Sequence, residues 1–528
     1  MNKLTQLALI SLAFTGSAFA APKSFTYCLE SSPAALNPQI ATDGATLDVG
    51  QAIYNRLIDF EKGTTNLTPS LAERWEISED GKIYTFFLRQ NVQFQSNKSF
   101  TPSRYFNADD VIFSINRQFD KTNPYHKLSD GNYEFFYGMN MQNIIKNVTK
   151  VDDYTVKIEL SEPNAPFLAN LAMDFMAIFS AEYANKMQIA GTPEKLDLEP
   201  IGTGAFQFYG YQKDAAVRFT AFEHYWEGKA KIDRLVFSIT PDASVRLAKL
   251  EKNECQAMPY PNPSDLSALK ANKDIQLFEK SGLNIGYITF NTRKPPFDNP
   301  KVRQALNYAV NKTEILTSVY QGSATPAKNP MPSTIWGYNN EVAGYEFNPE
   351  KAKSLLKEAG LENGFETEIW AMPVSRPYNP NARRMAEMIQ EDWKAIGVEA
   401  KIVSYEWGEY LKRMGNGEHA TGMIGWTGDN DDPDNFLNAL LSCNAVEQGS
   451  NYAGFCNPEF DRLINEAATI SDQNKRSDLY KKAQFIFNEQ APWLPIAHST
   501  VYFPVRKEVK GYVVSPFIAH NFYGVELE

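Results

Sequence analysis

Residues 283–309 read LNIGYITFNTRKPPFDNPKVRQALNYA, and this stretch indicates the architecture of the chain. Residues 283–291 have the composition of a strand. Asn299 and Pro300 then mark a helix start, because Asn is a preferred N-cap and Pro is favoured at the first helical position. The helix carries an apolar stripe, formed by Val302, Ala305, Leu306 and Ala309. A strand followed by an amphipathic helix predicts a mixed α/β fold.

The same alternation of strands and helices extends in both directions without a short repeat. Its 528 residues are enough for two to four domains, at about 100–200 residues each. We therefore expect an α/β protein of two lobes, one larger than the other. Strands are predicted over 82–89, 153–160, 365–372, 398–404 and 509–514, and helices over 107–120, 242–252, 348–360, 381–396 and 472–488.

Composition excludes several classes of protein. Hydrophobic residues make up 43% and charged residues 22% of the chain, which is ordinary for a globular protein and unlike a disordered, collagenous or coiled-coil chain. The 52 Lys and Arg against 63 Asp and Glu leave a net charge of −11, so no nucleic-acid partner is expected. The aromatic content of 13% is enough to line a large pocket as well as to fill cores.

The first 20 residues, MNKLTQLALISLAFTGSAFA, have the pattern of a secretory signal peptide. Lys3 supplies the positive charge, residues 7–14 the apolar segment, and residues 18–20 an A-x-A site that predicts cleavage after Ala20. The apolar stretch at 165–180 is too short to span a membrane and contains Asp174. It predicts a buried element in which that carboxylate is satisfied.

Four cysteines in an exported chain predict disulfides, and no C-x-x-C motif suggests a zinc or redox site. Cys443 and Cys456 flank a short polar loop, so we pair them, a closure worth about 3 kcal/mol in the chain-entropy model. The remaining pair is then Cys28 with Cys255. That bond would bring the N-terminal segment beside the middle of the chain, which predicts a domain built from discontinuous pieces.

Signatures of an exported hydrolase, the main rival class, are missing. Gly282 and Gly286 have the spacing of a G-x-S-x-G elbow, but Asn284 stands between them. There is no H-E-x-x-H, no P-loop, and Gln207 replaces the third glycine after Gly202 and Gly204. We therefore expect no enzyme activity, no metal site and no cofactor.

An acidic loop, Asp429-Asn-Asp-Asp-Pro-Asp434, follows the apolar run Met423-Ile-Gly-Trp426. It lacks the glycine and the final glutamate of a calcium loop. A polar turn is one interpretation. The other is a ligand site, because in α/β domains ligands bind at loops that follow strand ends.

Several motifs together resemble one family over nearly the whole mature chain. They are the block from Pro69-Ser-Leu-Ala-Glu-Arg-Trp-Glu to Arg89, Phe106-Asn-Ala-Asp-Asp-Val111, Pro200-Ile-Gly-Thr-Gly204, Asp242-Ala-Ser-Val-Arg246 and Lys301-Val-Arg-Gln-Ala-Leu306. The family is that of the periplasmic solute-binding proteins of ABC peptide importers, family 5. A further set resembles its dipeptide-binding subgroup, namely residues 376–384, Tyr405-Glu-Trp407 and Gly425-Trp-Thr-Gly-Asp-Asn430.

The resemblance implies a large class II periplasmic-binding-protein fold, in which two lobes joined by a two-segment hinge close on ligand. It places residues 1–20 in a signal peptide and residues 21–54, 207–282 and 500–528 in a discontinuous lobe I. Residues 55–206 are expected to form an extra subdomain of lobe I, and residues 283–499 to form lobe II.

By the same resemblance, Asp429 accepts the ammonium of a dipeptide and Arg376 binds its carboxylate through planar paired donors. Trp407 and Trp426 are expected to wall the pocket, although core packing is an equal alternative. Thr42 and Gly44 are weaker candidates for contacts from the opposite lobe. Asp431 stands where the family pattern has glycine, which adds charge close to Asp429.

The expected function is that of a monomeric, soluble periplasmic receptor that passes dipeptides to an inner-membrane ABC permease. Relatives on this scaffold bind other ligands, so a haem-binding or glutathione-binding receptor is an alternative within the family. A periplasmic holding chaperone is an alternative of another class.

Overall fold

The strand at the start of the opening stretch lies at the centre of the largest sheet. It forms β12 (Asn284–Phe290), in which every residue is buried, and it pairs antiparallel with β16 (Thr421–Thr427) and β17 (Trp493–Arg506). The predicted helix follows as α10 (Pro300–Tyr308), and the Asn299 side chain caps it by accepting from the Lys301 backbone N–H. The local pattern and the structure agree here because cap, proline and apolar stripe all favour the same helix.

The computed structural model describes residues 22–128, 133–517 and 519–528, so the predicted signal peptide lies outside the described residues. The largest sheet, here called sheet III, has the order β11-β17-β12-β16-β14-β15, with β13 paired to β17. The remaining strands of sheet III are β11 (Ile275–Ser281), β13 (Ala324–Pro326), β14 (Phe365–Trp370) and β15 (Val398–Val403).

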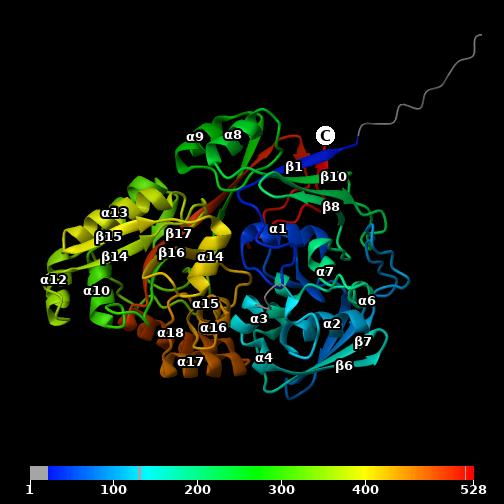
Figure 1. Ribbon diagram of the computed structural model, residues 1–528, viewed down its shortest axis with the longest axis horizontal. Helices are drawn as coiled ribbons and strands as arrows, with labels where there is room; N and C mark the ends of the chain where they lie inside the picture. Colours follow the sequence, from blue (N-terminus) through cyan, green and yellow to red (C-terminus); the bar gives the residue numbers. More distant parts are fainter. Residues whose placement is uncertain (1–21, 129–132, 518) are drawn as a thin grey trace, which may run out of the picture.

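Helices surround sheet III in the left half of Figure 1. Their amphipathic faces cover the sheet, as in other α/β layers. They are α11 (Lys312–Ile315), η4 (Leu316–Tyr320), α12 (Pro349–Glu358), α13 (Ala382–Lys394), α14 (Trp407–Gly415), α15 (Asp434–Leu441), α16 (Ala445–Gln448), α17 (Pro458–Thr469) and α18 (Gln473–Gln490), together with α10.

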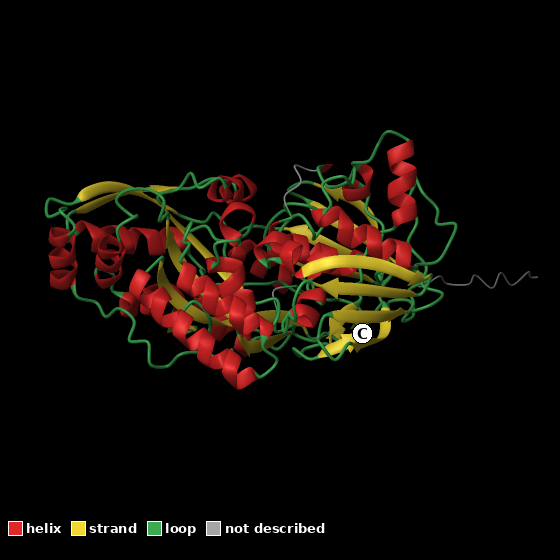
Figure 2. Cartoon of the chain, turned by 90° about the horizontal axis from the view of Figure 1, so that it is seen from below, coloured by secondary structure: helices red, strands yellow, loops and turns green. Residues whose placement is uncertain are grey.

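Two smaller sheets lie in the other half of the molecule (Figures 1 and 2). Sheet I has the order β1-β10-β9-β8, and sheet II the order β4-β5-β7-β6. The strands of sheet I are β1 (Ser24–Leu29), β8 (Phe206–Gln212), β9 (Ala216–Ala221) and β10 (Arg234–Ile239), and those of sheet II are β4 (Ala72–Ile77), β5 (Ile83–Leu88), β6 (Ile145–Asp152) and β7 (Thr155–Leu160).

Two hairpin-like pairs and a further set of helices complete this half. The pairs are β2 (Ile58–Phe60) with β3 (Leu67–Pro69), and β18 (Val509–Lys510) with β19 (Glu526–Leu527). The helices are α1 (Gly44–Ile53), α2 (Ala108–Phe119), α3 (Glu134–Gly138), α4 (Met141–Ile144), α5 (Phe167–Leu171), η2 (Asp174–Met176), α6 (Ala181–Ile189), α7 (Lys195–Leu198), α8 (Ala243–Glu251), η3 (Pro263–Asp265) and α9 (Leu266–Ala271).

The chain crosses between the halves twice, side by side. One crossing joins β11 to β12, and the other is β17, whose first half pairs with β12 and whose last residues pair with β11. Asn284 ties the crossings together, since its side chain donates to the Ser499 carbonyl at 3.0 Å and accepts from the Ser499 N–H at 2.9 Å. Gly282 permits this approach, because a Cβ there would lie 2.5 Å from the Ser499 carbonyl oxygen.

Both predicted disulfides are present. Cys28–Cys255 joins the end of β1 to the segment after α8, and both residues belong to a small buried cluster. Cys443–Cys456 closes the loop that contains α16. Sheet I is built from strands on both sides of residues 55–206, which agrees with the expected discontinuity. The boundaries given above for lobes and subdomain stay a prediction.

Most predicted elements have the expected type, and one is shorter than expected. Only Val509 and Lys510 of the 509–514 strand are in β18, and they pair with β19 in a two-stranded sheet. Asp174 is satisfied as predicted, since it accepts hydrogen bonds from Arg56 and Gln51. Among the described residues, no helix is long and apolar enough to cross a membrane.

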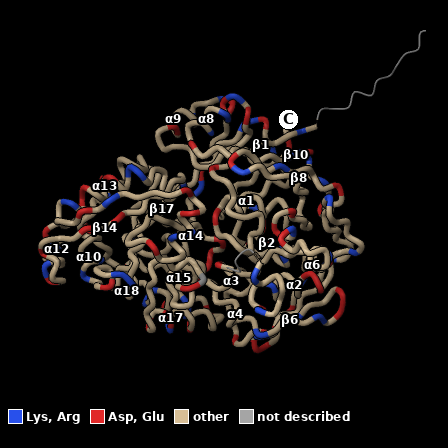
Figure 3. The backbone as a smooth tube through the Cα atoms, in the orientation of Figure 1, with Lys and Arg blue, Asp and Glu red and all other residues tan. Residues whose placement is uncertain are grey.

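Charged residues of both signs are scattered over the described part of the chain trace (Figure 3). The buried ion pairs are fewer and lie between elements that are distant in sequence. They include Arg117 with Asp197, Arg56 with Asp174, Arg376 with Glu30, and Arg476 with Asp432.

Candidate functional site

In the acidic loop after β16, side-chain oxygens accept hydrogen bonds from backbone N–H groups two residues further along the chain. The loop leads directly into α15. The Asn430 side chain accepts from the Asp432 N–H, and Asp432 in turn accepts from the Asp434 N–H at the start of α15. Arg476 of α18 neutralises Asp432 at 2.8 Å. Within the described part of the chain, no group of acids, histidines and cysteines has the arrangement of a metal site. The loop is therefore a rigid platform for its first residue, Asp429.

Asp429 is a buried carboxylate without a matching cation. It is 8% exposed, and its Oδ2 atom has no hydrogen-bond partner among the described residues. Its backbone N–H donates to the Asn435 side chain, which holds the residue in place. Burial raises the pKa of Asp429 well above its ordinary value, and the negative charge of Asp174 raises it further. An acid in this environment is stabilised strongly by an incoming cation.

Arg376 lies in the segment between β14 and α13 and is more deeply buried than Asp429. Its Nη1 donates to Glu30 Oε1 at 2.7 Å, and both side chains are 2% exposed. Its Nη2 has no partner among the residues that the structure describes. Burial alone lowers the pKa of Arg376, but Glu30 and the tyrosines around it more than offset this, so the guanidinium stays charged. It lies over the Trp407 ring, with 5.3 Å between Cζ and the ring centroid.

The N-terminus of α1 faces the same space. Asp43 caps this helix by accepting from the Thr46 backbone N–H, so the chain turns into the helix at residues 42–44. Free N–H groups and the helix dipole make such an end locally positive. Thr42 and Gly44 therefore lie where a ligand carboxylate is favoured.

One cavity brings these groups together. All six residues predicted for ligand binding line it, and they come from the two halves of the molecule. The space between its lining atoms is about 480 Å³, including space open to solvent. Its lining is Thr42, Asp43, Gly44, Arg376, Tyr378, Trp407, Leu411, Ile424, Gly425, Trp426, Thr427, Asp429 and Tyr452. Opposite charges with unused hydrogen-bonding atoms, in one cavity, suit a ligand that carries both an anion and a cation.

The two tryptophans have different surroundings. Trp426 donates from Nε1 to Asn435 and its ring packs edge-on against Phe135, so it serves the core as well as the cavity wall. Trp407 begins α14 and leaves its buried Nε1 without a partner in the described structure. Trp407 is therefore free to donate to a bound molecule.

The residues at the site that were not predicted include two acids and two tyrosines. Glu30 fixes Arg376, Asp43 caps α1, and Tyr378 and Tyr452 line the cavity. Asp43 stands between two predicted residues and could have been found as a helix cap. Glu30 had no such signal, since its partner is 346 residues away.

Contacts between the halves close the cavity on the side of sheet II. Glu134 of α3 accepts from Ser450 Oγ at 2.6 Å and from Tyr452 Oη at 3.0 Å, both in the loop closed by Cys443–Cys456. Asp431, where the family pattern has glycine, accepts from Thr65 Oγ1 at 2.7 Å. The extra carboxylate thus joins the two halves next to Asp429.

Comparison with known proteins identifies the family. Residues 66–448 match the family model described as bacterial extracellular solute-binding proteins, family 5 Middle. The chain belongs to this family. It is 59% identical to the dipeptide-binding protein of Escherichia coli (strain K12), over 99% of this chain and 98% of that protein. It is 50% identical to heme-binding protein A of Haemophilus influenzae, over 98% and 95% of the two chains.

A solved family 5 structure shows the same fold. The dipeptide-binding protein from Pseudoalteromonas sp. SM9913, in complex with Met-Leu, superposes with a TM-score of 0.94 at 41% identity. The match covers 96% of this chain and all of that chain. The chain therefore has the two-lobed family 5 solute-binding fold that the sequence predicts. Sheets I and II lie in one half of the molecule, and β12, β14, β15 and β16 lie in the other. Strands β11 and β17 belong to the crossings, and the cavity is lined by residues of both halves.

Proposed function

We propose that this family 5 protein is a periplasmic receptor that captures dipeptides between its lobes and delivers them to an inner-membrane ABC importer. The observation that carries the proposal is the cavity in which Asp429 Oδ2 and Arg376 Nη2 are both buried and both without a partner in the described chain. The relatives that bind dipeptides, at 59% and 41% identity, support the same ligand class.

A dipeptide in water is a zwitterion, so a dry cleft must match both of its ends. A buried charge left unpaired costs several kcal/mol, which makes each end depend on its own partner. Asp429 accepts the ligand ammonium. Arg376 donates to the ligand carboxylate from Nη2, assisted by the N-terminus of α1 at Thr42 and Gly44. Trp407 and Trp426 form the walls.

This arrangement selects ligand length more strongly than side chain. Both charged ends are held by side chains that are themselves fixed, Arg376 by Glu30 and Asp429 by Asn435. We expect ligands whose charged ends are separated by another distance to bind less tightly. We propose the segment boundaries given above, with residues 283–499 as lobe II, and export to the periplasm by cleavage of residues 1–20. The receptor acts as a monomer and catalyses no reaction.

Haem binding is the second candidate, because a relative that is 50% identical is named for it. Haem carries two propionates and no ammonium. It would leave Asp429 unpaired in the cavity, whose cation Arg376 is already shared with Glu30. The pair of charges therefore favours a zwitterionic peptide.

Titration calorimetry of the mature protein tests the proposal with three forms of one ligand: Ala-Ala, N-acetyl-Ala-Ala and Ala-Ala amide. The free dipeptide is expected to bind and to raise the melting temperature, since it binds only the folded state. Each capped form removes one charge and should lose about 2–5 kcal/mol, or more than 30-fold in affinity. Equal binding of all three forms, or a Soret shift with haem and no response to Ala-Ala, would overturn the proposal.

A further inference from the structure

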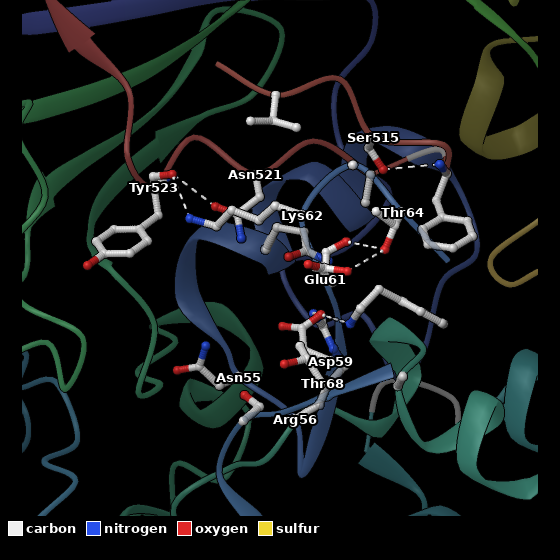
Figure 4. Close-up of a pocket in the computed structure, with 18 of the residues that line it drawn as sticks. Asn55, Arg56, Asp59, Glu61, Lys62, Thr64, Thr68, Ser515, Asn521 and Tyr523 are labelled. Carbon is white, nitrogen blue, oxygen red and sulfur yellow. Dashed lines mark hydrogen bonds and ion pairs between the residues drawn. The ribbon is translucent and has the colours of Figure 1, made fainter. Parts of the chain in front are cut away.

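A second and larger cavity also has Asp429 in its lining, and Figure 4 shows part of its wall. It encloses about 1450 Å³, including space open to solvent. Its walls come from the end of α1, the β2–β3 hairpin, η2, residues 225–227 and the C-terminal segment 511–523. Asp429 lines this cavity and the site described above, so the two spaces adjoin at this residue.

The lining of this cavity is acidic. Among the described residues it carries two cations, Arg56 and Lys62, and five carboxylates: Asp59, Glu61, Asp174, Glu227 and Asp429. An excess of carboxylates in a partly enclosed space disfavours anions and concentrates cations.

Both cations of the lining are already engaged. Arg56 is buried and donates from Nη1 to Asp174 and from Nη2 to Asp59. Lys62 lies at the far wall, where it donates to the Tyr523 carbonyl at 3.2 Å and lies over the Tyr523 ring (Figure 4). Because both cations already have partners, some carboxylate oxygens of the lining have no cation beside them.

Two carboxylates of the lining, Asp429 and Asp174, each have one oxygen that receives no hydrogen bond from a described residue. Asp429 is more than nine-tenths buried, and its Oδ2 has no partner in the described chain. Asp174 uses Oδ1 for both Arg56 and Gln51, and no hydrogen bond from a described residue reaches its Oδ2. The field of Asp174 reaches Asp429, because the charge of Asp174 contributes to the raised pKa of Asp429. The α-ammonium of a dipeptide bound at Asp429 supplies no cation to Asp174. A second positive group on the ligand would be needed to pair with Asp174.

We propose that the larger cavity is a subsite for a basic side chain on the first residue of the ligand, which Asp174 receives with support from Asp59. The proposal rests on the proposed function, since the α-ammonium of the dipeptide stays at Asp429. The side chain of the first residue then extends into the larger cavity. Lysine suits it, because a flexible apolar stem carries a compact charge with three donors to the carboxylates beyond Asp429. The receptor would thus prefer dipeptides with an N-terminal lysine to those with a neutral first residue.

The affinities of wild-type protein for Met-Ala, Lys-Ala, Ala-Lys and Ala-Ala-Ala test this proposal. Met-Ala has a side chain of similar shape without the charge. Lys-Ala is expected to bind about tenfold tighter than Met-Ala, the lower end of couplings measured for close charge pairs. Ala-Lys should bind like Met-Ala, because its charge lies on the other residue.

Different failures have different meanings. If Met-Ala binds and Lys-Ala binds no tighter, or if Ala-Lys shows the same gain, the subsite is refuted and the proposed function stands. If Ala-Ala-Ala binds tighter than Lys-Ala, the cavity takes a backbone extension instead of a side chain. If none of the dipeptides binds, the proposed function fails and the subsite with it.

The variant Asp174→Asn assigns the effect to one carboxylate. Measured on this variant, Lys-Ala and Met-Ala should bind with equal affinity, while Arg56 keeps Asp59 as its partner. Asp59→Asn should reduce the preference for lysine and serves as the second variant if Asp174→Asn does not fold. Asp392→Asn is the matched control, since it removes a partly buried carboxylate of lobe II that accepts from Asn311. An unchanged lysine preference in both cavity variants would overturn the assignment.

Discussion

Arg376 and Glu30 form an ion pair across the two lobes, with 2.7 Å between Nη1 and Oε1 and both side chains 2% exposed. Glu30 follows β1 in one lobe, and Arg376 follows β14 in the other. The ion pair uses Nη1 of the guanidinium and leaves Nη2 available to hydrogen-bond a ligand. Glu30 is therefore a positioning residue for the carboxylate end of the site.

Replacing Arg376 by Ala is expected to lower dipeptide affinity by at least 100-fold. The same change should lower the free energy of unfolding by about 3–5 kcal/mol, since Glu30 becomes a buried charge without its cation. The double variant Arg376→Ala with Glu30→Gln removes that charge and should recover much of the stability, but not the affinity. Calorimetry and chemical denaturation measure the two effects separately, and a double variant that binds like wild type would refute the role of Arg376.

Replacing Asp429 by Asn should remove both affinity and its pH dependence. Burial raises the pKa of this carboxyl in the free receptor, and a bound ammonium lowers it again. Below the free pKa, binding therefore releases a proton. Affinity of the wild type is expected to rise with pH until that pKa is passed, then to level off. Calorimetry in two buffers of different ionisation enthalpy measures the released proton, and an equal release from Asp429→Asn would assign it to another group.

Gly138, the last residue of α3, tests whether ligand affinity depends on closure of the lobes. A Cβ at Gly138 would lie 3.3 Å from the Gly449 Cα, and its next neighbours also belong to the other lobe. Gly138→Ala should weaken dipeptide binding slightly, and Gly138→Leu more than tenfold, because the larger side chain keeps the lobes apart. Unfolding should change little, since the obstruction exists only in the closed form. Gly415→Leu is the control, because a Cβ there meets no atom within 4 Å.

Gly282 tests the packing of the two crossings. Its Cβ would approach the Ser499 carbonyl oxygen to 2.5 Å and the Asn284 amide to 2.1 Å, and the former is backbone that cannot turn away. Gly282→Ala is expected to lower the stability by about 1–3 kcal/mol, the usual cost of overpacking. Gly415→Ala should be neutral or slightly stabilising, because alanine favours a helix. A Gly282→Ala variant as stable as wild type would show that the crossings can separate without cost.

Local signals predicted most helices and strands well. Asn299 with Pro300, Asn107 and Asp242 each cap the helix that they were expected to start. The two disulfides also followed from spacing and pairing alone. The strand predicted over 509–514 was wrong beyond Lys510. A strand extends only as far as its partner, and β19 pairs with β18 through two residues.

The sequence by itself determined the α/β elements, the helix caps, the disulfide pairs and, by resemblance to a family, the six residues that line one cavity. These features depend on neighbours in the chain or on motifs that stand in it. Only the tertiary structure decided what those residues face. Glu30 meets Arg376 across 346 residues, Asp431 meets Thr65, and Asp429 borders a second acidic cavity. The physical reason is that the burial and pairing of a charged group depend on which distant segments pack against it. The residues next to it in the sequence do not indicate which segments these are.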